Sequence, residues 1–281
     1  MIGELAAFAQ ALTIAFANTL GGKSTQLSSW RKTLRASSLI SFLLILILIL
    51  INFNNFSLIS MAIGILAGIS GGLGLPLAYQ AFSLGPVSFA SPIIAVMQSV
   101  NLIAFAVIAK NESLGATFPI ALLLAVIGLY LCSKKTEGNK PITFKVFYIS
   151  WAAAIFFSGF SILMTNIDKQ EILFALFGVR IGVLLVSLVF RPAPEKMPTT
   201  AAKAGLWKKY ALISGVCEIT ANILFMVAIN NLELSKVGIF MASSPMLSTL
   251  IAIKLLKQKP SVINWLGIFA SCSALLIIAL N

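Results

Sequence analysis

Histidine is absent from this 281-residue chain, and charged residues make up only 10% of it. Without histidine the chain has no His-ligated zinc or haem site and no Ser-His triad. An ordinary soluble domain carries about 25% charged residues, so this chain lacks the polar surface that a water-exposed α/β enzyme needs. These two absences exclude a soluble enzyme of this size, and we expect no catalytic residue and no enzyme activity.

Cysteine and acidic residues are also scarce. Cys132, Cys217 and Cys272 lie in apolar runs without metal-ligand or Cys-x-x-Cys spacing, which is typical of buried, hydrophobic cysteines. The 20 Lys and Arg residues against 8 Asp and Glu give a formal net charge of +12. Because the basic residues fall in short loops, they favour orientation in a membrane over binding of nucleic acid. We expect no metal, no cofactor and no nucleic-acid partner.

Long hydrophobic runs dominate the chain, which is 59% hydrophobic with a mean hydropathy of +1.01. About 20 apolar residues in a helix cross a bilayer core, and runs of that length recur throughout. Unpaired backbone groups are too costly in lipid, so the runs are expected to be helices, and the short alternating segments of a membrane barrel are missing. The expected spans are 2–20, 36–53, 59–81, 86–109, 116–133, 143–166, 171–190, 207–229, 235–255 and 261–280.

An internal repeat divides these spans into five and five. A polar stretch at 134–142 separates the two groups, and one offset without gaps aligns Gly68 with Gly215 and Ser88 with Ser235. Five spans in each half place the second half in the opposite orientation, as in alternating-access transporters. We predict an all-α membrane protein of ten transmembrane helices, in two inverted-topology five-helix repeats, 1–133 and 143–281, joined by 134–142.

Loop charges predict the orientation of the chain. Almost all basic loop residues fall on one side of the expected spans, and the other side carries Lys110, Lys169 and Lys236. By the positive-inside rule, the basic side is cytoplasmic and both termini lie outside.

Two connectors resemble those of a known family. Residues 81–92, Ala-Phe-Ser-Leu-Gly-Pro-Val-Ser-Phe-Ala-Ser-Pro, resemble the connector of the EamA-type drug/metabolite transporter superfamily, which leads into a helix with an internal proline. Residues 110–114, Lys-Asn-Glu-Ser-Leu, resemble its Gly-Glu connector. In the second half, Lys259-Pro260 replaces the acidic connector and Glu233 replaces the connector proline. The resemblance covers nearly the whole chain and implies a ten-helix transporter that exports an amino acid or a related metabolite.

Helix-breaking residues mark candidate gates. Each proline inside a span removes a backbone hydrogen bond, which either opens a kinked helix to a central cavity or serves packing alone. These prolines are Pro76, Pro92 and Pro245. Gly64 and Gly68 repeat at a four-residue spacing with Gly72, which predicts one helix face open to close approach by another helix.

Two charged residues are expected near the bilayer centre. The apolar run after Arg180 is too short to span alone, so its helix must begin near Glu171, and Glu218 lies midway along its own span. A lone charge at that depth costs about 2.5 kcal/mol or more, so such residues pair or serve a transport pathway. We expect Arg180 and Glu218 to form a substrate or proton site, with a structural ion pair as the alternative.

Other side chains at membrane depth are candidates to line a cavity. Polar clasps between helices explain the amides equally well, and an interfacial position suits the tryptophan better. The candidates are Gln10, Tyr79, Gln98, Asn101, Trp151, Ser158 and Asn222.

Together these features predict a secondary-active transporter of a small polar metabolite in a bacterial inner membrane. It is expected to be a monomer or a homodimer, whose two halves rock about a midplane site. Uptake of a nucleotide-like or drug-like solute is an alternative within transport. A membrane scaffold or accessory subunit without turnover is the alternative from another class.

Overall fold

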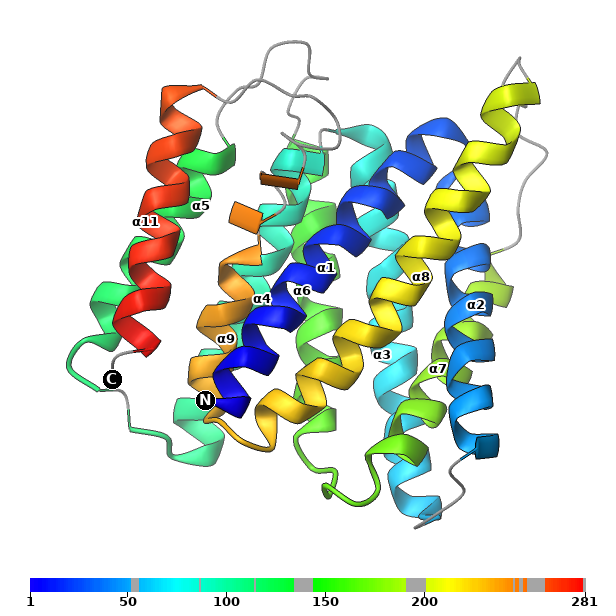
Figure 1. The fold of residues 1–281 in the computed structure, drawn as a ribbon, viewed down its shortest axis with the longest axis horizontal. Coiled ribbons are helices and arrows are strands. Elements are labelled where there is room, and N and C mark those ends of the chain that lie inside the picture. The colour runs from blue at the N-terminus through cyan, green and yellow to red at the C-terminus, as the bar shows by residue number, and fades with distance from the viewer. Residues whose placement is uncertain are drawn as a thin grey trace.

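A computed structural model shows a bundle of helices (Figure 1). It describes residues 1–51, 56–85, 87–113, 115–133, 144–190, 201–244, 246–247, 250–251 and 261–279, and no strand occurs among them. The helices are α1 (Ile2–Leu27), α2 (Trp30–Ile51), α3 (Leu58–Leu84), α4 (Val87–Lys110), α5 (Phe118–Ser133), α6 (Phe144–Met164), α7 (Ile172–Val189), α8 (Ala201–Ile229), α9 (Leu234–Ala242) and α11 (Val262–Ala279).

Seven helices in the described part of the chain are long and apolar enough to cross a membrane. They are α1, α2, α3, α4 from Ile93, α6, α7 and α8 from Gly205. The described part of the chain is therefore helical without strands, as predicted, and seven of its helices are suited to crossing a membrane. Each of the ten expected spans contains a described helix, but crossings beyond these seven stay a prediction.

Several helices extend past the expected span boundaries. The first helix, α1, continues to Leu27, and α2 already begins at Trp30, so Lys23 and Arg31 lie in helices rather than in a loop. A helix of 26 residues is about 39 Å long at 1.5 Å per residue. Since the hydrocarbon core is about 30 Å thick, a helix of this length either tilts in the membrane or extends beyond its hydrocarbon core.

Eight helices pack around a common centre. In order of contact the ring runs α1, α8, α2, α7, α3, α6, α4 and α9, and α9 closes it against α1. The remaining pair, α5 and α11, pack on each other at one edge of the bundle (Figure 1). Helices of one sequence half therefore pack mainly on helices of the other half. A rocking motion of the two halves about a midplane site stays a prediction.

The glycine face of α3 packs closely against α7, as its four-residue spacing predicts. Gly64 and Gly68 lie so close to the backbone of Ala175 and Val179 that a Cβ atom on either glycine would overlap it. Such small residues let two helix backbones approach one another. The contact fixes the height and rotation of α7, and with them the position of Arg180, the next residue after Val179.

Two of the three candidate gate prolines lie in helices that the structure describes. Pro76 is buried inside α3, and the helix continues through it to Leu84. Pro92 lies inside α4, close to its start at Val87. Pro245 lies outside the described residues. A gating role for the three prolines stays a prediction.

Candidate functional site

A cavity of about 110 Å³ lies inside the ring of helices. A buried water needs about 10–15 Å³ of such space, so the cavity has room for several waters or a small solute. Three aromatic side chains, Phe157, Phe160 and Phe225, contribute to its apolar wall. Its polar lining from the first sequence half comes from Gln10, Asn18, Tyr79 and Gln98, and from the second half it comes from Ser161, Arg180, Glu218, Asn222 and Ser244.

Arg180 and Glu218 meet across this cavity. Arg180 Nη1 lies 3.9 Å from Glu218 Oε2, and the two side chains are only 2% and 8% exposed. Arg180 Nη2 also donates to the Glu218 backbone carbonyl at 3.3 Å. The two residues come from α7 and α8, which pack on α2 from either side. The expected contact is present, and pairing is what makes two such deeply buried charges tolerable.

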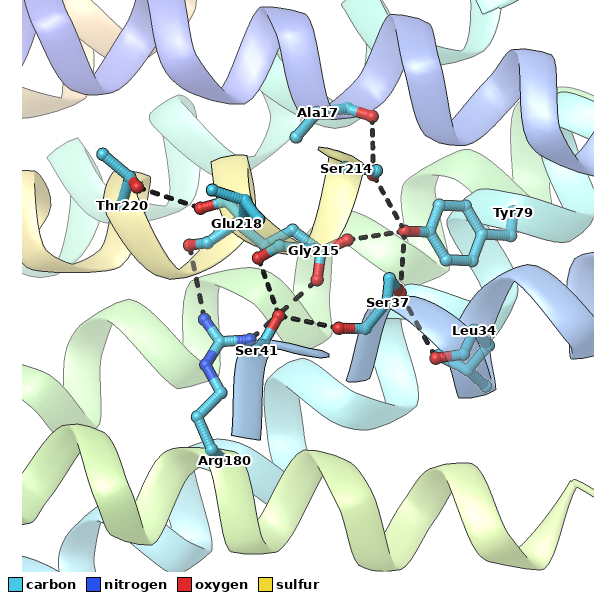
Figure 2. A network of polar contacts seen from close by, with 11 residues as sticks. Ala17, Leu34, Ser37, Ser41, Tyr79, Arg180, Ser214, Gly215, Glu218 and Thr220 are labelled. Atoms are coloured by element: carbon cyan, nitrogen blue, oxygen red, sulfur yellow. Dashed lines mark hydrogen bonds and ion pairs between the residues drawn. The ribbon is translucent and has the colours of Figure 1, made fainter. Parts of the chain in front are cut away.

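Tyr79 from α3 holds the other oxygen of the Glu218 carboxylate (Figure 2). The phenol Oη donates to Glu218 Oε1 at 2.5 Å. It also lies 3.4 Å from Ser37 Oγ and 3.5 Å from Ser214 Oγ. Ser214 in turn donates to the Ala17 carbonyl at 2.9 Å. The carboxylate is thus tied to a hydroxyl network that joins α1, α2, α3 and α8.

Asn222 completes the cluster one turn after Glu218 on the same face of α8. Oriented with its oxygen toward Arg180, the Asn222 amide accepts from Arg180 Nη2 at 2.6 Å and donates to the Glu218 carbonyl at 3.3 Å. Within the described residues, Gln10 Oε1, Glu218 Oε2 and Arg180 Nε have no hydrogen-bond partner. Two buried acceptors and one buried donor among the residues that line the cavity are therefore unsatisfied within the described part of the chain.

Four of the seven cavity-lining candidates are placed at the cavity. Gln10, Tyr79, Gln98 and Asn222 line it together with Arg180 and Glu218. Gln98 Nε2 donates to Ser161 Oγ at 3.2 Å and to the Phe157 carbonyl at 3.4 Å, and so joins α4 to α6 at the cavity wall.

Asn101, Ser158 and Trp151 are not among the lining residues. Asn101 Nδ2 donates to Ser158 Oγ at 3.0 Å, so this pair forms a polar clasp between α4 and α6 instead. Trp151 is 43% exposed. It precedes the lining residue Phe157 by six positions, or about 240° around the helix at 3.6 residues per turn. The clasp of Asn101 with Ser158 and the exposed position of Trp151 agree with the alternatives that the sequence left open for them.

The cavity also contains residues that the sequence analysis missed. Asn18 follows Gln10 by eight residues on α1. This spacing returns close to the same helix face, so the sequence could have predicted that Asn18 lines the cavity with Gln10. The phenylalanines Phe157, Phe160 and Phe225 carry no such signal, because an apolar side chain at membrane depth looks the same whether it faces lipid, core or cavity. Among the described residues, no group of three or more His, Cys, Asp or Glu could hold a metal ion.

Comparison with known proteins identifies the family of this chain and a solved structure that shares its fold. No curated protein matches the chain. A solved crystal structure, described only as that of a protein, shares the fold with a TM-score of 0.74 at 15% sequence identity, over 99% of this chain and 96% of the other. A family model described as "Sugar transport protein" matches residues 2–280. This match shows a transporter family. It does not show the EamA type, which the two connectors resemble. The chain therefore belongs to the sugar transport protein family, and it is a helical protein of a membrane-transporter family.

Proposed function

We propose that the protein is a secondary-active transporter that carries a small polar solute through the central cavity by alternating access. The observation that carries this proposal is the cluster of Arg180, Glu218, Tyr79 and Asn222 in the cavity wall. Buried charges in membrane helices are costly and mark pathways or partners. A scaffold gains little from an ion pair that faces a cavity with unoccupied hydrogen-bonding atoms.

A neutral polyhydroxy solute, such as a monosaccharide, is the substrate class that we propose. A hydroxyl group both donates and accepts, so it could satisfy the acceptors Gln10 Oε1 and Glu218 Oε2 and the donor Arg180 Nε, which lack hydrogen-bond partners among the described residues. Mostly apolar and aromatic walls with a few converging polar groups are typical of small-molecule sites. The family description supports the same class.

Export of an amino acid or related metabolite is the second candidate. The opposite charges of Arg180 and Glu218 complement a zwitterion, which offers a carboxylate to the guanidinium and an ammonium to the carboxylate. This binding would require the solute to separate the ion pair, whereas a neutral solute leaves it in place.

The inverted repeat is part of the proposal and has structural support. Exchanging α1 to α5 with α6, α7, α8, α9 and α11 leaves the order of neighbours around the ring unchanged. Gly68 and Gly215, aligned by the sequence repeat, lie against the backbones of Val179 in α7 and Ser37 in α2. These are corresponding contacts, one on each side of the contact between α2 and α7.

Flux into proteoliposomes tests the transport proposal. The full chain is reconstituted and offered labelled hexoses, pentoses, amino acids and nucleotides, with empty liposomes as the baseline. Saturable flux of a neutral sugar is expected, and Asp168→Asn, an exposed carboxylate change outside the cavity, should leave it intact. Selective amino-acid flux would favour the second candidate. Folded protein without flux of any solute would contradict transport.

A further inference from the structure

Glu112, in the connector between α4 and α5, binds the start of α9 in the other sequence half. Its Oε1 accepts from the Leu234 backbone N–H at 3.0 Å, and its Oε2 accepts from the Ser235 N–H at 3.0 Å. The first N–H groups of a helix have no partner within the helix, and negative charge is favourable there. Both carboxylate oxygens are therefore used by one helix end, 122 residues away in sequence.

A nearer carboxylate is present but does not cap the helix. Glu233 occupies the N-cap position of α9, yet its side chain makes no cap hydrogen bond. Instead its Oε2 lies 3.7 Å from Lys236 Nζ, and its side chain is 55% exposed. The cap of α9 is thus a contact between the two halves of the chain rather than a local feature.

The backbone before Glu112 directs it toward α9. Asn111 has a φ of 53°, the one positive φ among the described non-glycine residues, in a region that asparagine adopts more readily than most side chains. The Glu112 N–H then turns back to donate to the Ala106 carbonyl at 3.1 Å. From the other side, a Cβ on Gly3 of α1 would lie 2.6 Å from Leu232 Cγ. The connector into α9 is therefore held between α1 and the end of α4.

This contact lies at the end of the bundle that carries both chain termini (Figure 1). The helix that it holds, α9, packs between α1 and α4 in the ring, and the cavity is lined by Met241 near its far end and by Ser244, two residues after that end. Beside the cap is a polar hollow of about 170 Å³, lined in part by Lys110, Glu112 and Asn230. Water in this hollow can solvate the carboxylate and the N–H groups if they separate.

We propose that Glu112 is a positioning residue that locks the start of α9 against α4 and so keeps this end of the cavity closed. The effect of this lock on flux rests on the proposed transport function. The contact between Glu112 and the start of α9 does not depend on that function. By sequence, the second-half connector carries Lys259-Pro260 instead of an acidic residue, so the carboxylate lock has no counterpart there. The lock biases the transporter toward closure at the end with the termini.

Amide hydrogen exchange of the purified full chain tests the lock directly. Glu112→Gln keeps the side-chain shape and one acceptor but removes the charge, and it should speed exchange at Leu234 and Ser235 about tenfold. Faster exchange should extend along α9 to Met241. Glu233→Gln, which changes the neighbouring carboxylate without touching the cap, is the matched control and should leave exchange unchanged.

Cavity access gives the second readout, which a purely local cap would not move. Ser244→Cys is labelled with a membrane-impermeant thiol reagent from the side of the termini, above the background of the three native cysteines. Labelling should be several-fold faster when Glu112→Gln is added, and unchanged when Glu233→Gln is added. Thermal unfolding of each variant confirms that the bundle is intact.

Two results would overturn the lock. Unchanged exchange at Leu234 and Ser235 in Glu112→Gln shows that the carboxylate does not hold the helix. Faster exchange confined to those two amides, with unchanged labelling of Ser244→Cys, shows a local cap without control of the cavity. If exchange and labelling both rise while no solute is carried, the lock stands and the proposed transport function fails.

Discussion

The two oxygens of the Glu218 carboxylate have different surroundings. Oε1 accepts the Tyr79 hydroxyl at 2.5 Å and is fixed by it. Oε2 lies 3.9 Å from Arg180 Nη1 and, within the described residues, accepts no hydrogen bond. One oxygen therefore anchors the side chain, and the other is left to accept a hydrogen bond from a solute or to take up a proton. At the scale of single residues, this asymmetry is the feature most suited to a transport step.

Glu218→Gln is expected to leave the protein folded but to abolish or uncouple flux. The amide is nearly the same size as the carboxylate, but it neither carries the charge that pairs with Arg180 nor takes up a proton in the working pH range. Flux should be measured against pH in proteoliposomes, where the variant should show a flat profile. A parent rate with an unchanged pH profile would make the ion pair purely structural.

Arg180→Ala is expected to destabilise the fold by about 3–5 kcal/mol, because it leaves a buried carboxylate without its counter-charge. The double variant Arg180→Ala with Glu218→Gln should recover much of that loss, since neither charge then remains. Thermal unfolding in detergent compares the four proteins of this double-mutant cycle. Equal destabilisation in the single and the double variant would mean that lost packing, rather than charge, explains the effect.

Among the elements, α3 has the closest helix contacts. One face packs on α7 through Gly64 and Gly68, and Gly71 and Gly74 lie against Phe160 and Phe157 of α6. Small residues on two faces let the α3 backbone approach that of α7 and let phenylalanine side chains of α6 pack directly on α3. Tyr79 lies near the end of this helix, so the same packing also sets the partner of Glu218.

Gly68→Ala should destabilise the protein by about 1–3 kcal/mol and lower flux, because a Cβ there overlaps the backbone of Val179. The displaced α7 would also move Arg180 away from Glu218. Gly205→Ala on α8 is the matched control, since nothing lies within 4 Å of its Cβ position. The unfolding temperature and the flux of the two variants are compared. Equal unfolding temperatures and equal flux would refute the close α3–α7 contact.

At the scale of the whole molecule, the two chain termini lie at the same end of the bundle (Figure 1). The ring of helices draws on both halves of the sequence, with α5 and α11 outside it. This placement agrees with the ten crossings that the sequence predicts, and the loop charges predict that both termini lie outside the cytoplasm.

A topology reporter that is active only outside the cytoplasm checks this orientation. Fused after Asn281 it should be active, and inserted within 134–142 it should be silent. The reverse pattern would invert the orientation while keeping the repeat. Activity at both sites would contradict an odd number of spans between them.

Hydropathy along the sequence was enough to predict an all-helical membrane protein and to place Arg180 and Glu218 at similar depth. The four-residue glycine spacing also predicted a close helix contact, although not its partner. These features are local, because length, composition and spacing report how deep a residue lies and which face of its own helix it occupies.

Only the tertiary structure decided which helices those faces meet. It put Asn18 at the cavity and Asn101 with Ser158 in a clasp beside it, and it brought Glu112 to the start of α9. It also interleaved the two halves of the chain in one ring. The physical reason is that the rotation of a helix about its axis is set by packing against neighbours distant in sequence, whereas hydropathy fixes only its depth in the membrane.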